Sequence, residues 1–349
     1  MLRLRDLGWT TSHDLSFQPF RDRGLVPGRV VVEHRESYRV AAEDGERLSS
    51  LPGRLRHQAT GRADLPAVGD WVALADRPAE GRATIQHVLP RATALVRKVC
   101  GDESESQVIA ANVETVLVVV GLDADFNLRR IERALALVWE SGAQPVLVLN
   151  KADVCPDREV RLAEASEVAV GVPIHVLSAL AGEGVEAIDG LLRAGSTLAV
   201  LGSSGVGKST LINRLLGEEL LAVKAVRDTD GRGQHTTTSR QIVRLPGGAL
   251  LVDTPGIREF GVPGGGDGVS VAFADVEEAA QACRFRDCRH ASEPGCAVRE
   301  AIDAERLAAW RKLEREREYV ESKTNERLRL ARSRRFKTLG KTYRKTPHK

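Results

Sequence analysis

The segment LGSSGVGKST, at residues 201–210, limits the possible folds of this chain more than any other stretch. Gly202, Gly207, Lys208 and Ser209 match the pattern G-x-x-x-x-G-K-[ST], between the apolar run TLAVL and the helical pattern KSTLINRLL. Glycines in such a loop let backbone N–H groups surround phosphates, and the N-terminus of the next helix adds a favourable dipole. We therefore predict a nucleotide phosphate-binding loop between a buried strand and a helix.

The side chains of this loop also suit phosphate chemistry. Lys208 is expected to neutralise β- and γ-phosphate oxygens, and Ser209 to hold Mg²⁺. The residues predicted to contact the phosphates are Gly202, Ser203, Ser204, Gly205, Val206, Gly207, Lys208, Ser209 and Thr210. The alternative is a glycine-rich turn without a ligand, but the flanking strand and helix favour the phosphate loop.

Two later segments have the composition of nucleotide-sensing loops. In LLVDTPG, Asp253 ends an apolar strand and suits an outer-shell role near Mg²⁺, while Gly256 can present its N–H to the γ-phosphate. In HTTTS, three threonines precede another strand, and we choose Thr237 among them as a Mg²⁺ ligand. A Ser/Thr cluster before a strand is also an ordinary loop, so this second interpretation has a plain alternative.

An earlier segment, VLVLNKADVC, has the chemistry to read guanine. The Asp153 carboxylate can accept hydrogen bonds from N1–H and from the 2-amino group, a pair that adenine does not offer. Lys151 is expected to lie over the base and Asn150 to tie this loop to the phosphate loop. A second loop, Ser178-Ala179, can offer a backbone N–H to guanine O6. The predicted base-loop residues are Asn150, Lys151, Ala152, Asp153, Ser178 and Ala179.

The order of these segments is reversed relative to an ordinary GTPase, because the base loops precede the phosphate loop. In a parallel sheet, a nucleotide contacts the loops at the carboxyl ends of the strands, whatever their order in the chain. Moving the termini leaves that arrangement intact, so we predict a circularly permuted GTPase domain. The sequence after Asp-Thr-Pro-Gly leads directly into the C-terminal region, which suggests that nucleotide state is transmitted downstream.

The patterning predicts a multidomain α/β protein. Residues 1–24 show no clear pattern and receive no role. Residues 25–98 contain short β-rich runs (GRVVVEH, YRVAAED, GRLRH, GDWVALAD, ATIQHVL), which favour a small β-barrel of the oligonucleotide-binding (OB) type or another small barrel. Alternating strands and helices over residues 99–262 indicate a doubly wound parallel sheet. Residues 263–349 are predicted to form a zinc-binding domain with helices and a basic tail.

Three cysteines and one histidine crowd into fourteen residues near the C-terminus. The pattern Cys283-x4-Cys288-x-His290-x5-Cys296 supplies the Cys₃His ligand set that Zn²⁺ prefers in closed, structural sites. We predict one such zinc site, which would stabilise a subdomain with little core of its own. The alternative is a group of free cysteines beside a chance histidine.

The charge distribution points to a polyanionic partner. Residues 323–349 carry eleven Lys or Arg and one acid, a balance of +10, so the other 322 residues sum to −7. A basic tail on an acidic body suggests RNA, and a solvated tail without a partner is the alternative. Apolar runs are too short for a membrane span or a secretory signal, so we expect no membrane contact and a cytoplasmic location. A monomer is expected by default.

Taken together, these motifs resemble the ribosome small-subunit-dependent GTPase A family, a circularly permuted bacterial GTPase. The resemblance rests on GRLRH and VGDWV in the barrel region, the permuted motif order, HTTT, DTPGIREFG and the cysteine–histidine spacing. It implies an RNA-binding barrel, a GTPase domain and a zinc domain. It further implies a late maturation factor of the small ribosomal subunit that binds its rRNA and hydrolyses GTP to GDP when stimulated by the subunit.

The position of the catalytic water is not specified by these motifs. Ras-like enzymes often place a glutamine after Asp-x-x-Gly, whereas Ile257 stands here, as it generally does in the family. Many members carry a histidine shortly after REFG, and this sequence does not. His235 is a candidate, and the alternatives are that it is an ordinary loop residue and that hydrolysis depends instead on Mg²⁺, Lys208 and groups from the ribosome. Two other functions stay open: a permuted GTPase acting elsewhere in ribosome assembly, and an RNA-binding scaffold with GTP as a structural ligand.

Overall fold

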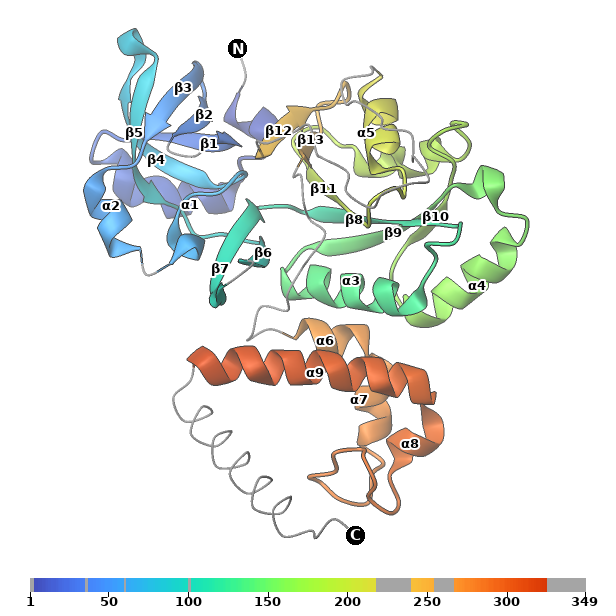
Figure 1. The fold of residues 1–349 in the computed structure, drawn as a ribbon. Helices are drawn as coiled ribbons and strands as arrows, with labels where there is room; N and C mark the ends of the chain where they lie inside the picture. The colour runs from blue at the N-terminus through green and yellow to red at the C-terminus, as the bar shows by residue number, and fades with distance from the viewer. Residues whose placement is uncertain are drawn as a thin grey trace. The chain divides into compact units, whose positions relative to one another are not determined.

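The computed structural model describes residues 3–34, 37–59, 61–99, 102–217, 240–253 and 267–324 (Figure 1). The chain divides into two compact units, Met1–Gly261 and Val262–Lys349. The described strands all belong to the first unit, and the described regular elements of the second unit are helices.

The first unit begins with a mostly β region and then alternates strands and helices. Its strands are β1 (Val26–Glu33), β2 (Tyr38–Ala42), β3 (Gly45–Ser50), β4 (Trp71–Arg77), β5 (Arg82–Val88), β6 (Ala94–Val99), β7 (Asp102–Ala111), β8 (Thr115–Gly121), β9 (Gln144–Asn150), β10 (Ile174–Val176), β11 (Thr197–Leu201), β12 (Arg240–Arg244) and β13 (Leu250–Asp253). Its α-helices are α1 (Thr11–Arg21), α2 (Gly53–Gln58), α3 (Leu128–Glu140), α4 (Arg158–Val168) and α5 (Lys208–Leu216). Short 3₁₀ helices are η1 (Leu4–Leu7), η2 (Arg62–Asp64), η3 (Pro78–Glu80), η4 (Ala152–Val154) and η5 (Val185–Leu191).

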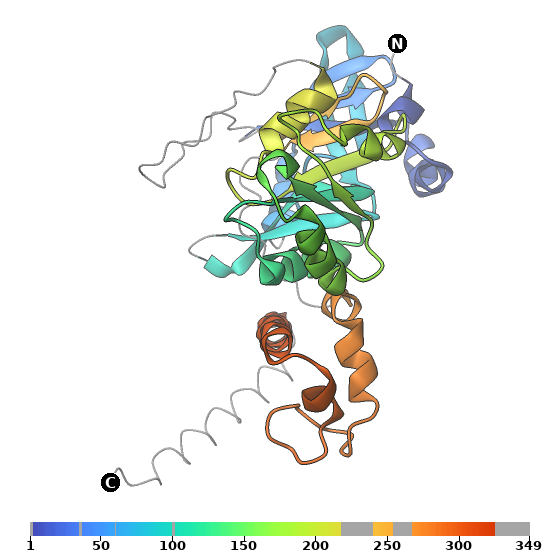
Figure 2. The same ribbon diagram turned by 90° about the vertical axis from the view of Figure 1, so that its right-hand side faces the viewer.

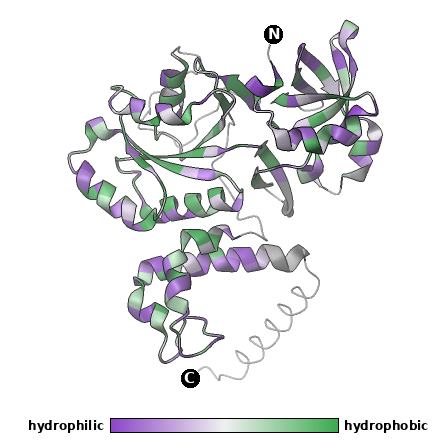
Figure 3. Ribbon diagram, turned by 180° about the vertical axis from the view of Figure 1, so that it is seen from behind, coloured by the Kyte–Doolittle hydropathy of each residue, from purple (hydrophilic) through white to green (hydrophobic). Residues whose placement is uncertain are grey.

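Strands β8 to β13 form a sheet covered on both faces. The order is β10-β9-β8-β11-β13-β12, with parallel pairing except at β12, which runs antiparallel to β13. Alternate residues of β8 face opposite cores: Val116, Val118 and Val120 pack with α3 and α4, and Leu117 and Val119 with α5 and η5 (Figures 1 and 2). Burial on both faces explains the continuous run VLVVV, and Figure 3 shows these strands as hydrophobic.

Strands β1 to β5 close into a barrel. The order is β1-β2-β3-β5-β4, and β4 pairs back onto β1; β3 and β5 are parallel, and the other pairs are antiparallel. The hairpin of β6 and β7 forms a separate two-stranded sheet, so β6 lies within residues 25–98 of the sequence but outside the barrel.

The barrel differs from the sequence interpretation at one segment. The run GRLRH, predicted among the β-rich segments, is helical and forms α2, because it follows Pro52 at the helix N-cap and joins β3 to β4 outside the ladder. Tyr38 and Trp71, two aromatic residues of the barrel strands, are 7% and 1% exposed and belong to the barrel cores. They therefore stabilise the barrel and offer no free ring face to a nucleic acid.

Residues 1–24, which received no role from the sequence, contribute to the core. Trp9 and Phe17 are buried against Trp71, and the Trp9 and Trp71 rings meet edge to face with centroids 4.8 Å apart. Phe17 lies in α1 and Trp9 just before it, so the helix closes one side of the barrel core. The sequence of α1 shows no clear amphipathic pattern because the helix is short and buries few residues.

Replacing Phe17 with alanine should therefore destabilise the first unit by about 3 kcal/mol, because it removes a fully buried aromatic side chain and leaves a cavity. Leu15→Ala, on the same helix but 70% exposed, is the matched control and should change the stability by less than about 0.5 kcal/mol. Urea unfolding of the two variants measures the difference. Equal stabilities would show that α1 does not belong to the core.

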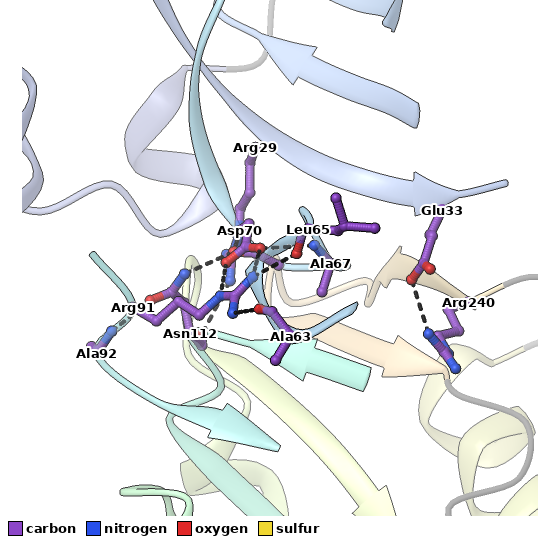
Figure 4. Close-up of polar contacts among 11 residues, drawn as sticks. Arg29, Glu33, Ala63, Leu65, Ala67, Asp70, Arg91, Ala92, Asn112 and Arg240 are labelled. Atoms are coloured by element: carbon purple, nitrogen blue, oxygen red, sulfur yellow. Dashed lines mark hydrogen bonds and ion pairs between the residues drawn. The ribbon is translucent and has the colours of Figure 1, made fainter. Parts of the chain in front are cut away.

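A buried arginine joins the barrel to the α/β sheet. Arg29 of β1 is 1% exposed, and its guanidinium donates to the carbonyl oxygens of Leu7, Gly69 (3.2 Å) and Asn112 (3.1 Å) and to Oγ1 of Thr197 (2.9 Å). Figure 4 shows Arg29 beside Asn112. Burial lowers the pKa of Arg29 to about 10, so it remains charged at neutral pH. The contacts join the N-terminal segment, the barrel and the start of β11.

A buried ion pair lies beside Arg29 in the barrel (Figure 4). Asp70, fully buried, accepts two hydrogen bonds of 2.7 Å from Arg91, which also donates to the carbonyl oxygens of Ala63 and Leu65 (Figure 4). The backbone N–H of Ala67 donates to the same carboxylate at 2.8 Å. Because its partners satisfy both carboxylate oxygens, this buried charge is compatible with a stable core.

The second unit is helical and small. Its helices are α6 (Gly268–Ala272), α7 (Ala274–Ala280), α8 (Ala297–Ala301) and α9 (Ala304–Thr324). Val269, Phe273, Val276, Val298 and Leu307 are buried, and Arg306 pairs with Asp275 at 2.6 Å. In the part of the chain that is described, no helix combines the length and apolar character needed to cross a bilayer. The basic tail predicted for residues 323–349 lies almost entirely outside the described residues.

Candidate functional site

The predicted base and phosphate loops lie at one edge of the sheet. Strands β8, β9 and β11 are parallel neighbours, so their carboxyl ends, at Gly121, Asn150 and Leu201, share that edge. The phosphate loop follows β11, and the segment Asn150–Asp153 follows β9. Loops more than fifty residues apart in the sequence are thus adjacent in space, as the permuted order requires.

The side chain of Asn150 connects the three predicted nucleotide loops. Its Nδ2 donates to the carbonyl oxygen of Val206 in the phosphate loop at 2.7 Å, and its Oδ1 accepts from the backbone N–H of Ala179 at 2.9 Å. Asn150 is 2% exposed, so water does not compete for these bonds. Ala152 adds a backbone bond to the carbonyl oxygen of Leu177 at 3.2 Å. The loops therefore form one hydrogen-bonded assembly.

Two glycines are needed for this close approach. A Cβ atom on Gly207 would lie 2.3 Å from Nδ2 of Asn150, and one on Gly202 would lie 2.3 Å from the carbonyl oxygen of Val119. Both have positive φ, 93° and 157°, respectively. The two fixed glycines of the motif thus have steric as well as phosphate-binding reasons to be glycine.

An arginine that sequence reasoning missed secures the second base loop. Arg214, on α5 directly after the phosphate loop, donates to the carbonyl oxygens of Ala179 at 3.2 Å and Leu180 at 2.7 Å. Within that loop, Ser178 is fully buried, and its Oγ accepts from the N–H of Ala181 at 3.0 Å. The second predicted base loop is therefore fixed by Arg214 from α5 and by Ser178 from within the loop.

The two predicted lysines both contact protein groups. Lys208 Nζ donates to the carbonyl oxygens of Gly202, at 2.8 Å, and of Ser203. Lys151, with a φ of 69°, places its Nζ 2.5 Å from Oδ2 of Asp123. Partial burial acts to raise the pKa of Asp123, but bonds from Lys151 and the Asp125 N–H lower it below its usual value. Both cations thus have local partners that a nucleotide would have to replace or share.

The loop after β8 also contacts the phosphate loop. The Ser203 hydroxyl donates to the carboxylate of Asp125, Arg130 pairs with the same carboxylate, and Arg130 Nη1 donates to Ser203 Oγ at 3.3 Å. Arg130 follows the N-cap of α3, where Asn127 accepts its backbone N–H at 3.0 Å. The signal in the sequence was the pattern Asp-x-Asp directly after a buried strand, whose carboxyl end lies at the nucleotide edge.

Several predicted site residues lie outside the described residues. These are Thr237, its neighbours in HTTTS, the candidate His235, Gly256 and Ile257. Asp253 ends β13, where its backbone lies opposite Gln241 of β12, and β13 is the neighbour of the strand that carries the phosphate loop. Asp153 is exposed and belongs to η4, and Ser209 and Thr210 lie in the first turn of α5.

The cysteine–histidine cluster has the geometry of a tetrahedral metal site. The ligand atoms of Cys283, Cys288, His290 and Cys296 all lie within 4.8 Å of one another. Sγ of Cys283 is 4.0 Å from Sγ of Cys296, and Nδ1 of His290 is 3.6 Å and 3.5 Å from these two sulfurs. A zinc ion at bond lengths of 2.3 Å to sulfur and 2.0–2.1 Å to nitrogen gives edges of about 3.8 Å and about 3.5 Å. The residues therefore fit zinc, with Nδ1 as the imidazole ligand atom.

Surrounding groups favour the metal-binding protonation state at two of the four ligands. Backbone N–H groups of Val298 and Ala297 lower the pKa of the Cys283 thiol, and burial lowers the pKa of His290. At Cys288 the backbone N–H of His290 lowers the pKa, but burial and the neighbouring thiols outweigh it and raise the pKa to about 11. Glu293 organises the loop between the ligands by accepting backbone N–H bonds from Ala291 (2.8 Å), Ser292 (3.0 Å) and Arg289 (3.1 Å). Backbone N–H bonds, including its own, lower the pKa of Glu293 to about 2. These residues can hold a metal ion.

Comparison with known proteins shows the family of this chain. The RsgA GTPase family model matches residues 88–263. The small ribosomal subunit biogenesis GTPase RsgA of Opitutus terrae is 46% identical over 91% of this chain and 91% of its own length. The protein of the same name from Streptomyces coelicolor is 43% identical over 97% of this chain and 93% of its own.

Solved structures share the fold. The crystal structure of YjeQ from Thermotoga maritima has a TM-score of 0.61 and 28% identity, covering 83% of this chain and 97% of that one. YloQ, whose structure is described as a circularly permuted GTPase, has a TM-score of 0.57 at 20% identity, covering 86% and 96% of the two chains. With the family model, the relatives and the nucleotide edge in agreement, the chain belongs to the RsgA GTPase family and is a GTP hydrolase.

Proposed function

We propose that this chain hydrolyses GTP as a late assembly factor of the small ribosomal subunit. The observation that carries the proposal is the Asn150 assembly, which holds the phosphate loop and both predicted base loops in one place. The curated relatives of the family are named small ribosomal subunit biogenesis GTPases, which supports the choice of target. Water would be added across the β–γ phosphoanhydride bond, giving GDP and phosphate.

The residue roles in this proposal combine the contacts described above with the motifs of the sequence. Asp153, which is exposed at the base edge, would accept the N1–H and 2-amino hydrogen bonds of guanine. The phosphate-loop N–H groups and Lys208 would hold the phosphates, with Lys208 leaving its carbonyl partners. Ser209, with Thr237, would hold the Mg²⁺ that shields phosphate charge. Either His235 or a group of the small subunit would orient the attacking water.

The proposal also assigns a role to each domain of the chain. We assign residues 1–24 as an extension, 25–98 as an OB-type barrel, 99–262 as the GTPase domain and 263–349 as the zinc domain with its tail. The closed β1-β2-β3-β5-β4 order supports the barrel type. Barrel and tail would contact rRNA, the tail through phosphate charge. A cytoplasmic location follows from the proposed target.

GTP turnover measured with and without purified small subunits tests this function. We expect slow hydrolysis alone, clear acceleration by small subunits and none by large subunits, with Lys208→Ala inactive in both conditions. Acceleration by large subunits alone would favour a GTPase acting elsewhere in assembly. Tight GTP binding without turnover under any condition would identify a scaffold that uses GTP as a structural ligand.

A further inference from the structure

Strand β12 lies between the barrel and the strand that ends at Asp253. Gln241 is opposite Val32 of β1 on one side and opposite Asp253 of β13 on the other. One row of cross-strand neighbours therefore runs from the barrel to the aspartate predicted to lie near Mg²⁺. At about 4.8 Å per strand, the Asp253 backbone is only roughly 10 Å from the barrel strand.

The joint between β1 and β12 is short, and one side chain secures it. Its register consists of the pairs Val32–Gln241 and Glu33–Arg240. Arg240 Nη1 donates to Glu33 Oε2 at 3.0 Å (Figure 4), and its Nη2 donates to Gln107 Oε1 of β7 at 3.1 Å. The two charged side chains are 15% and 21% exposed, so water screens this pair less than a surface pair.

The Arg240 contact lies next to both segments that are predicted to sense the nucleotide. Arg240 opens β12 three residues after Thr237 in the sequence, and Asp253 closes β13 three residues before Gly256. Both segments predicted to sense the nucleotide therefore join the sheet at the corner that Arg240 holds. Ile242, two residues on, packs against both the sheet core and the N-terminal barrel core, so the corner belongs to both.

We propose that Arg240 is a positioning residue for GTP hydrolysis, held in place by Glu33 of the barrel and Gln107 of β7. The inference rests on the proposed function and adds a route by which the barrel acts on turnover. A ligand that holds the barrel in place also restrains β1. Through its pairing with β12, β1 in turn restrains the position of the first residues of β12. Because catalysis depends on placement to within about an ångström, a loosened corner should slow hydrolysis more than it weakens GTP binding.

The expected result is a split between kcat and KM. In Arg240→Gln, we expect basal kcat to fall about tenfold and KM for GTP to stay within about twofold. Glu33→Gln should likewise lower kcat and leave KM nearly unchanged, because it removes the other charge of the pair. Acceleration by small subunits should fall in both variants relative to the unmutated protein, since the barrel no longer controls the corner.

A charge exchange separates positioning from folding. In the double variant Glu33→Arg with Arg240→Glu, the ion pair is restored in reverse, and the Gln107 amide can donate through its nitrogen instead. We expect this variant to recover kcat, subunit acceleration and melting temperature together. Glu46→Gln breaks an exposed pair with Arg39 elsewhere in the barrel and should leave all three unchanged.

The outcomes distinguish this inference from the proposed function. If the unmutated protein hydrolyses GTP but small subunits do not accelerate it, the proposed function fails, and the basal kcat of Arg240→Gln still tests the positioning role. If subunits accelerate the unmutated protein and Arg240→Gln alike, with equal basal kcat, the inference is overturned. It is also overturned if the charge exchange restores the melting temperature but not kcat, because the ion pair between positions 33 and 240 would then stabilise the fold without determining turnover.

Discussion

Replacing Asn150 with alanine is expected to weaken GTP and GDP binding by about a hundredfold to a thousandfold. The change removes the donor to the Val206 carbonyl and the acceptor for the Ala179 N–H, both inside a site that excludes water. Each buried group left without a partner costs about 1–3 kcal/mol, and together they release the phosphate loop from the base loop. Titration with a fluorescent guanine nucleotide measures the loss.

A matched control is available at the joint between barrel and sheet. Asn112 also makes two side-chain hydrogen bonds, accepting from the Ala92 N–H at 2.9 Å and donating to the Gly69 carbonyl at 3.1 Å. Asn112→Ala should lower the free energy of unfolding at least as much as Asn150→Ala, because its φ of 53° also disfavours alanine. Its nucleotide affinity should remain within about twofold of the unmutated protein. Equal losses of affinity would mean that Asn150 acts through stability alone.

The parts of the fold that the sequence predicted are those with a strong local signal. A parallel strand buried on both faces needs an apolar run such as that in β8, and a phosphate loop needs glycines at fixed positions, here Gly202 and Gly207. The alternation of strands and helices and the predicted adjacency of the loops follow from these signals. The spacing of the cysteines and His290 likewise predicted a cluster that the structure brings together.

What the sequence did not reveal depends on distant contacts. Nothing near Arg29 indicates that its partners are Leu7, Asn112 and Thr197, because these residues meet only once barrel and sheet have formed. The same holds for Arg240 and Glu33, which are 207 residues apart. Charged residues in strands are ordinarily expected to face solvent, and only tertiary packing shows that Arg29 is buried and that Arg240 and Glu33 are partly buried.

Removing the metal should unfold the second unit. We expect one zinc ion per chain, and Cys296→Ser or treatment with a strong chelator should eliminate it. Structural zinc contributes about 10–16 kcal/mol of binding free energy in small domains, more than the buried side chains around Phe273 can replace. The measurements are zinc content, helix content by circular dichroism and protease resistance of residues 267–324.

Trp310 offers a local report of the same event, because its ring lies edge to face against His290 with centroids 5.5 Å apart. Loss of zinc should free the imidazole and change the Trp310 fluorescence, a change that Trp310→Phe removes.

Cys155→Ser is the matched control, since this partly buried thiol lies in the first unit, and it should retain one zinc ion and full helix content. A second unit that keeps its helices and protease resistance without metal would show that the cluster does not hold the fold. Nucleotide affinity should survive zinc removal, because the Asn150 assembly lies wholly within the first unit.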